Sequence, residues 1–266
     1  MSSMLKFTLL DNSRSFLREA LSKALLAQND VHQWKFAIFN ICQAIEISLK
    51  ERLSREHPAL ILENIDKGTK TVSPKAAMAR LSKLCGVTIS KDDVAAIESA
   101  TKWRNEIVHA QFSLNVTALK SAFSVMLGFI RSFHEVVLSE SLADHMPKEL
   151  WKQALEIQEY GQELFNRAAQ QIKDEGIDPN DIISCPRCSR AACRLLEDTC
   201  RCYVCGAQED LCECESCGNL VPESRTERSW TGISEDEMRK VYICKDCIDG
   251  AEDVYIQHLI DLRRGK

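Results

Sequence analysis

The sequence predicts a mainly α protein, in which a helical bundle is followed by a long helix and then by a small, metal-stabilised α+β module. Three observations lead to this fold class. Apolar residues recur at steps of three and four through about the first 175 residues, which is the spacing of one helix face. Prolines, glycines and capping residues divide that stretch into separate helices. Four C-x-x-C pairs then crowd into the last third of the chain, where short segments between cysteines favour small β-hairpins.

Five helices are expected in the first part of the chain, and several have clear end signals. Ser73 precedes Pro74, and proline is favoured at the first helical position, whereas Gly86 suits a helix end. Ser90 can cap the next helix, and the acidic residues that follow it suit a helix N-terminus. The expected ranges are Asn12 or Ser13 to about Asn29, Val31 to Arg55, Ser73 to Gly86, Ser90 to about His109, and Asn115 to about Ser139.

A further long helix is expected from Met146 and Pro147 to Gly176. Its small and apolar residues form a narrow seam of coiled-coil type. They are Leu150, Ala154, Ile157, Gly161, Leu164 and Ala168. The seam favours packing on the bundle of the same chain, and the alternative is a partner helix in a dimer. Two later segments, Ser234 to Tyr242 and Ala251 to Arg263, also have helical patterns.

Eight of the thirteen cysteines form the four C-x-x-C pairs. Zinc binds four thiolates tetrahedrally, and a two-residue gap lets one tight turn direct two sulfurs at one ion. We therefore expect two structural Zn²⁺ ions, each enclosed by four thiolates and left with no open coordination position. The predicted ligands are Cys185, Cys188, Cys202, Cys205, Cys214, Cys217, Cys244 and Cys247.

The cysteines leave several alternatives open. A disulfide framework is typical of oxidising compartments, but the opening MSSMLKFTLLDN lacks the apolar run and cleavage site of a signal peptide. The four pairs can combine sequentially, or first with third and second with fourth. Cys42 and Cys85 have the apolar surroundings of core residues. Cys193, Cys200 and Cys212 lie within the metal region and can replace a predicted ligand.

Length and charge set limits on domain organisation and partners. The 266 residues suit a helical domain at 1–145, a connecting helix at 146–180 and a double zinc-binding, zinc-ribbon-like module at 181–266. No apolar run approaches the roughly 20 residues of a membrane span, so we expect a soluble, cytoplasmic protein without a membrane partner. The net charge of −5 disfavours purely electrostatic nucleic-acid binding.

The most informative polar residues lie on the helix that is expected to end at His109. Arg104 falls within a broad apolar arc of this helix, and Asn105 and His109, four residues apart, stack along its edge. An arginine on an apolar face needs a partner. Glu46, on the apolar stripe of the second helix, is the natural one. The pair can be purely structural, an ion pair that holds two helices together.

Arg104-Asn105-Glu106-Ile107-Val108-His109 resembles the R-[polar]-x(3-5)-H signature of HEPN domains. Glu46 lies where many of these domains carry an acidic residue in an early helix. The resemblance covers about Ser13 to Ser139, roughly half of the chain, and does not include the zinc module. The same arginine–histidine spacing recurs from Arg52 to His57 at a polar helix end, where we interpret it as chance.

The resemblance implies a metal-independent endoribonuclease, of a kind found among toxins, CRISPR effectors and phage-defence proteins. His109 would act as general acid or base, and Arg104 would hold the scissile phosphate. Asn105 would orient the phosphate or the histidine ring, and Glu46 would position Arg104 or His109. RNA would be the substrate, and its own 2′-OH the nucleophile.

The resemblance also implies a homodimer, because two such motifs commonly meet at one composite site. The zinc module would then serve recognition or regulation, and a regulatory protein partner is an open possibility. The alternative is a non-catalytic helical dimer that binds RNA, a nucleotide or a protein. In that case Arg104 and Glu46 are structural, and the negative net charge favours this reading.

Overall fold

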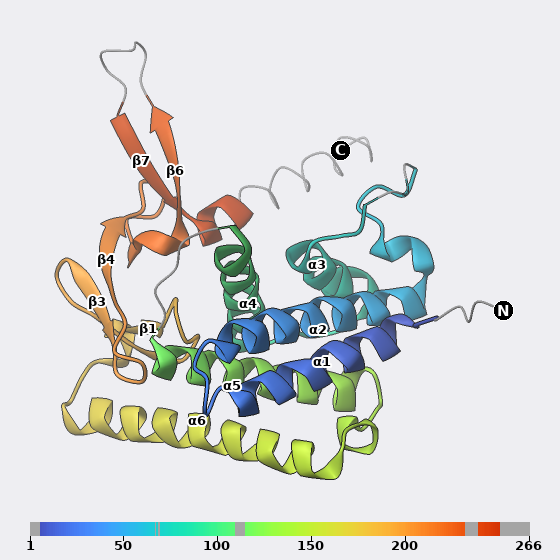
Figure 1. Ribbon diagram of the computed structural model, residues 1–266. Helices are drawn as coiled ribbons and strands as arrows, with labels where there is room; N and C mark the ends of the chain where they lie inside the picture. Colours follow the sequence, from blue (N-terminus) through green and yellow to red (C-terminus); the bar gives the residue numbers. More distant parts are fainter. Residues whose placement is uncertain (1–5, 67, 69, 110–114, 232–238, 251–266) are drawn as a thin grey trace.

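The computed structural model describes residues 6–66, 68, 70–109, 115–231 and 239–250, with backbone only at 109, 228–231, 239 and 240 (Figure 1). This part of the chain is predominantly helical, and its named strands all lie after residue 181. The long helices are α1 (Leu9–Leu26), α2 (Gln33–Glu56), α3 (Pro74–Cys85), α4 (Lys91–His109), α5 (Val116–Ser132) and α6 (Lys148–Asp174).

Short helical turns connect these elements. They are η1 (Pro58–Ile61), the π-helical turn η2 (Phe133–Val137), η3 (Leu142–His145), η4 (Pro179–Asp181) and η5 (Glu223–Arg225).

The first five helices surround one apolar core. Helix α2 pairs with the antiparallel helix α1 and packs on α5, and α6 runs along α5 and also contacts α1 (Figure 1). Trp34 meets Phe123 edge to face, with ring centroids 5.6 Å apart. The largest fully buried side chains are Leu17, Leu21, Ile38, Ile41, Ile45, Leu49, Leu53, Leu81, Ile97, Leu119, Phe123 and Met126. They come from all five helices, which confirms the predicted helical packing.

The capping signals predict most helix starts correctly. Ser73 Oγ accepts a hydrogen bond from Ala76 N, Gly86 closes α3 with a φ of 64°, and Ser90 Oγ accepts from Asp93 N. The predicted start at Asn12 or Ser13 is wrong, because Thr8 caps α1 instead. Ser13 lies inside that helix and is fully buried.

The expected helix to Ser139 is interrupted. After Ser132 the chain widens into η2, and Ser139 has a φ of 57°. The wider turn places His134 in the core, where its Nε2 lies 2.9 Å from Ser48 Oγ. Ser13 Oγ lies 2.7 Å from the same hydroxyl. This small polar network between α1, α2 and η2 gives a physical reason for the break.

The seam of α6 packs within the chain. Ala154, Gly161 and Ala168 are buried on it. A Cβ added at Gly161 would overlap the Ser124 side chain of α5, so the Gly161 backbone packs directly against that side chain. The intramolecular packing is therefore confirmed, and the seam is not free to hold a partner helix.

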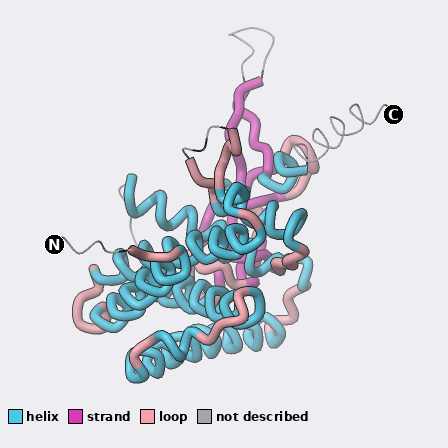
Figure 2. Tube along the Cα trace, turned by 90° about the vertical axis from the view of Figure 1, so that its right-hand side faces the viewer, coloured by secondary structure: helices cyan, strands magenta, loops and turns pink. Residues whose placement is uncertain are grey.

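The C-terminal region is built mainly from antiparallel strands. Five form one sheet in the order β1-β2-β3-β4-β5, and two form a separate ribbon. The strands are β1 (Ile182–Ser184), β2 (Ala191–Leu195), β3 (Thr199–Cys202), β4 (Gln208–Glu213), β5 (Leu220–Pro222), β6 (Thr226–Thr231) and β7 (Arg239–Cys244). Figure 2 shows these strands beside the helices. A second buried cluster joins Ala118 of α5 and Ala168 of α6 to the sheet.

The predicted helix from Ser234 to Tyr242 is wrong in its described part. Residues 239–244 form β7, which pairs with β6 in register from Thr226–Cys244 to Thr231–Arg239. Val241 and Ile243 alternate with Lys240 and Tyr242, and this period of two suits a strand. The predicted helix from Ala251 to Arg263 lies outside the described residues.

One segment has the length and composition of a membrane span. Val116–Val137 is 22 residues long, but Lys120 and Arg131 interrupt its apolar residues, so the expectation that no apolar run approaches a membrane span is not overturned. Most of it is buried inside the chain, as the core helix of a bundle would be.

Candidate functional site

The first cysteine group lies at one end of the five-stranded sheet. Cys185 and Cys188 flank a tight turn after β1, and Cys202 and Cys205 flank the turn after β3. The Sγ atoms of Cys185 and Cys205 lie 3.7 Å apart, and those of Cys188 and Cys202 lie 3.6 Å apart. A tetrahedral ion with metal–sulfur bonds of about 2.3 Å requires separations of about 3.8 Å. All four residues are buried, and the group can hold a metal ion.

The second group joins the β4–β5 turn to the end of β7. Cys214 and Cys247 have sulfurs 3.9 Å apart, as do Cys217 and Cys244. All four sulfurs lie within 4.8 Å of one another, so this group also can hold a metal ion. Cys217 is exposed and Cys247 is half-buried, so the second group is more open than the first.

In each group the surroundings favour the thiolate form of at least one cysteine. Backbone N–H groups of Cys244, Cys217 and Ser216 donate to Cys214 and lower the pKa of that thiol to about 6. The Cys188 thiol, together with other nearby thiols, donates to Cys185 and holds its pKa far below the usual value. Arg187 N also donates to Cys185 Sγ, at 3.3 Å. Neighbouring thiols and burial raise the pKa of Cys188, Cys205 and Cys244, so these thiols would lose their protons when a metal ion binds the thiolate form.

The structure resolves the open alternatives among the cysteines. The four pairs combine sequentially, and all thirteen cysteines are free thiols rather than disulfides. Cys193 is buried beside Cys185 but stands outside the four-sulfur group. Cys212 donates to Val221 O instead, and Cys200 is buried in β3. Cys42 donates to Ala100 O in the core, where burial raises its pKa.

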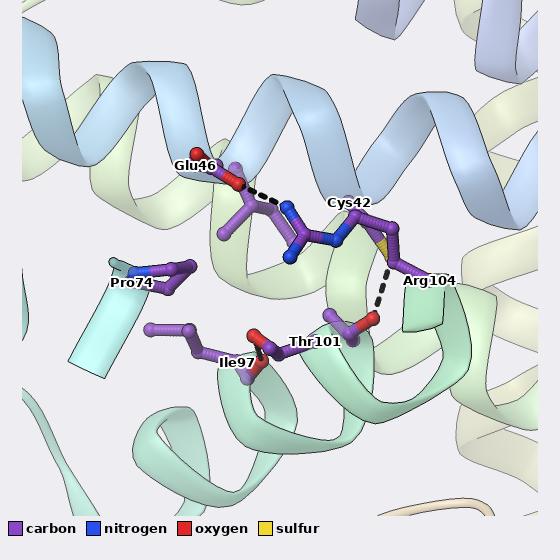
Figure 3. Close-up of a pocket in the computed structure, with 8 residues that line it drawn as sticks. Cys42, Glu46, Pro74, Ile97, Thr101 and Arg104 are labelled. Atoms are coloured by element: carbon purple, nitrogen blue, oxygen red, sulfur yellow. Dashed lines mark hydrogen bonds and ion pairs between the residues drawn. The ribbon is translucent and has the colours of Figure 1, made fainter. Parts of the chain in front are cut away.

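Arg104 extends from α4 across a small pocket to α2 (Figure 3). Its Nη1 donates to Glu46 Oε2 at 2.8 Å, so the predicted partner of this arginine is present. Cys42, Pro74 and Thr101 line the same pocket, whose volume of about 10 Å³ suits a single water molecule. No scissile phosphate fits inside it.

Glu46 has a second cationic partner that the sequence reasoning missed. Lys50 Nζ lies 2.6 Å from Glu46 Oε1 and also donates to Thr71 Oγ1. The four-residue spacing from Glu46 to Lys50 on α2 was the available signal. Glu46 is only 16% exposed, and two cations neutralise it there.

Asn105 completes the contacts of Arg104. Its Oδ1 accepts from Arg104 Nε at 3.3 Å and from Nη2 at 3.2 Å. Because guanidinium has five N–H donors, two of them have no partner in the described part of the chain. The arginine side chain is 29% exposed, so these donors can reach a ligand at the surface.

His109 is the last residue of α4, and its side chain lies outside the described part. At 3.6 residues per turn, position 109 lies about 40° around the helix from Asn105 and about 140° from Arg104. Helices α2 and α4 therefore bring Glu46, Arg104 and Asn105 together, with position 109 one turn beyond Asn105.

The opposite side of α4 rests on the first cysteine group, which the sequence reasoning also missed. Trp103 Nε1 donates at 3.0 Å to the carbonyl of Arg187, inside the Cys185–Cys188 turn. Arg187 also forms ion pairs with Glu106, at 3.2 Å, and Glu209, at 3.3 Å. The polar set and the first cysteine group are thus joined through one helix.

Comparisons of this chain with protein-family models, with curated proteins and with solved structures find no match. The function therefore has to be argued from the residues of the site.

Proposed function

We propose that this chain is a metal-independent endoribonuclease of HEPN type, with two structural zinc ions in its C-terminal region. The observation that carries the proposal is the arrangement of Arg104 between Glu46 and Asn105, with position 109 one turn beyond Asn105. A guanidinium held on two sides with two free N–H groups is preorganised for a phosphate. This arrangement supports the resemblance to the HEPN signature.

The proposed chemistry uses the ribose of the RNA itself. The 2′-oxygen attacks the adjacent phosphorus, the bond to the 5′-oxygen breaks, and a 2′,3′-cyclic phosphate and a 5′-hydroxyl form. One histidine of the composite site accepts the 2′-OH proton, and a proton returns to the leaving 5′-oxygen. Arg104 stabilises the negative charge on the phosphate, Asn105 orients it, and Glu46 keeps the arginine in place.

Zinc is the metal that suits the two cysteine groups best. Four thiolates in a tetrahedral arrangement favour Zn²⁺ over the oxygen-loving cations, and leave no position for a substrate. Both ions would therefore be structural. We expect two zinc ions per chain by elemental analysis.

Because the pocket at Arg104 is too small for a phosphate, the proposed reaction takes place at the protein surface. A homodimer that brings two α4 ends together would supply a second Arg104, Asn105 and His109 set and enclose the phosphate. Val108 supports this surface as a contact, because it is apolar and 53% exposed directly before His109.

The proposal is tested by comparing the wild type with His109→Ala on a mixed cellular RNA pool. We expect His109→Ala to reduce cleavage at least about a hundredfold, which is the usual contribution of a general acid or base. His57→Ala is the matched control, because it removes the histidine of the second arginine–histidine spacing. It should cut like the wild type.

Two outcomes would contradict the assignment. Equal cleavage by the wild type and His109→Ala would mean that other residues carry the reaction. RNA left uncut by the wild type, whatever activator is supplied, would favour the alternative of a non-catalytic binding dimer. The ion pair between Arg104 and Glu46 would then only join two helices.

A further inference from the structure

A cleft of about 560 Å³ lies between α4 and the cysteine-rich region. Its walls are the first half of α4, the turn of the first cysteine group, β5 with η5, and the segment after β7. The two edge strands of the five-stranded sheet, β1 and β5, both border it. Clefts of this size commonly hold small molecules.

Four cationic side chains line the cleft: Lys91 and Lys102 from α4, Arg225 from η5, and Lys245 from the second cysteine group. Within the described part of the chain, none of the four lies within ion-pair distance of a carboxylate. Lys102 is half-buried, and burial lowers its pKa. A bound anion would offset the cost of removing such charges from water.

Metal ions bound to the cysteine groups would change the charge around the cleft but would not neutralise its cationic side chains. A divalent ion with four thiolates leaves two negative charges on each cysteine group. Lys245 lies between Cys244 and Cys247 in the sequence, so we assign it to the charge of that group rather than to a ligand. Lys91, Lys102 and Arg225 lie on other elements and remain available.

Buried hydroxyl groups without partners point to a missing ligand. Ser99 lines the cleft from α4 and is only 7% exposed, yet its hydroxyl has no hydrogen-bond partner among the described residues. The Ser224 hydroxyl oxygen, on the facing wall, is also covered and has no hydrogen-bond partner among the described residues. An unsatisfied buried polar group is costly, and a ligand that pairs with it removes the cost.

The carboxylates that line the cleft indicate a second kind of group on the ligand. Glu98 and Asp246 line the cleft and can accept hydrogen bonds from hydroxyl groups. Asp249 is already paired with Lys75. A ligand with both a phosphate and hydroxyl groups matches these two sets of side chains.

We propose that this cleft binds a small phosphorylated molecule that carries hydroxyl groups. The phosphate contacts Lys102, Arg225 and the Ser99 hydroxyl, and the hydroxyl groups face Glu98 and Asp246. This site is separate from the Arg104 pocket, which lies on the α2 side of α4. The proposal therefore does not depend on the ribonuclease activity.

The test is isothermal titration calorimetry on the zinc-loaded, full-length protein. The probes are ribose 5-phosphate, glycerol 3-phosphate and inorganic pyrophosphate, with ribose as the phosphate-free control and a 2′-O-methyl RNA oligomer as the macromolecular alternative. We expect the wild type to bind ribose 5-phosphate and not ribose. Lys102→Gln and Arg225→Gln should each weaken binding at least tenfold, and Ser99→Ala should weaken it several-fold.

Lys152→Gln is the matched control, because Lys152 is an exposed lysine of α6 that does not line the cleft. It should bind like the wild type, and thermal unfolding should show that all variants are folded. Failure of every phosphorylated probe to bind the wild type would overturn the proposal. Binding that Lys102→Gln and Arg225→Gln leave unchanged would place the ligand elsewhere and overturn it too. Binding of the RNA oligomer alone would assign the cleft to nucleic acid instead.

Discussion

Gly161 sits where α5 and α6 come too close for a side chain. An added Cβ would overlap Ser124 Oγ and Cβ, and Ser124 is held by its hydrogen bond to Gln158 O at 3.1 Å. Gly161→Ala should therefore lower the free energy of unfolding by about 1–3 kcal/mol, as overpacking does. At Gly128 on α5, an added Cβ would lie 3.4 Å from the nearest atom, Gln158 Nε2, which is ordinary van der Waals contact.

Gly128→Ala is the matched control for this prediction. Alanine favours a helix over glycine by about 1 kcal/mol, so stability should stay the same or rise. Urea unfolding of both variants measures the difference. Equal effects would show that Gly161 does not pack directly against Ser124.

His134 makes the stability of the fold depend on pH. It is fully buried, and burial lowers its pKa from 6.5 to about 4. The unfolded chain therefore binds a proton on this residue before the folded chain does. The contribution of neutral His134 to the free energy of unfolding is fully present above pH 6.5. It is lost as the pH drops toward 4, which lowers the free energy of unfolding by up to about 3 kcal/mol.

Unfolding measured between pH 7 and pH 4 checks this, with His134→Gln as the comparison. The variant should be less stable at pH 7 but should lose less stability on acidification. A parallel pH dependence in both proteins would mean that His134 is not buried as a neutral ring.

The sequence anticipated some of these residues and not others, for physical reasons. The partnership of Arg104 with Glu46 follows from placing charges on apolar faces, because a buried charge needs a partner. The position of Ser13 in the core does not follow from the sequence, because a serine at that place is an equally good helix cap. The burial of His134 depends on contacts with Ser48, which is distant in sequence.

The Cys185–Cys188 turn should report metal loss through Trp103. The indole N–H donates to Arg187 O inside that turn, so loss of the first ion should break this contact and shift Trp103 fluorescence to the red. The second cysteine group includes the exposed Cys217, and its ion should leave first. In a chelator titration, the ion of the second group should leave first without a fluorescence change. The ion of the first group should leave later, together with the red shift.

Trp103→Phe is the control for this titration, because the shift should disappear while metal release stays in two steps. Simultaneous release of both ions, or a Trp103 response to the first ion released, would contradict the difference in burial between the groups.

Elements with local signals were predictable, and elements set by tertiary contacts were not. Capping by Ser73, Ser90 and Asn115 fixed three helix starts correctly. The sequence did not predict β7, because its alternation of apolar and polar residues is short and the strand is stabilised by pairing with β6. The sequential pairing of cysteines could not be derived, because both pairings satisfy the same spacing. The β2–β3 hairpin decides it by returning Cys202 to the first turn.

At the scale of the whole molecule, the proposed composite site would be built by two chains. Light scattering should give twice the chain mass at micromolar concentration. Val108→Glu should shift the protein toward a monomer, because a charge would replace an exposed apolar contact beside His109. Val136→Glu is the control, since Val136 is 74% exposed on η2. A monomeric wild type, unchanged by added RNA, would count against the composite site.

The central claim is RNA cleavage through the 2′-OH by Arg104, Asn105 and His109. The most direct measurement is the chemistry of the ends left when the zinc-loaded protein cuts RNA in brief contact with EDTA. We predict a 2′,3′-cyclic phosphate or its hydrolysed form, a 5′-hydroxyl, and no cut where a single 2′-deoxynucleotide replaces the ribose at the cleavage position. Products with a 3′-hydroxyl and a 5′-phosphate, or cleavage at the 2′-deoxy position, would contradict it.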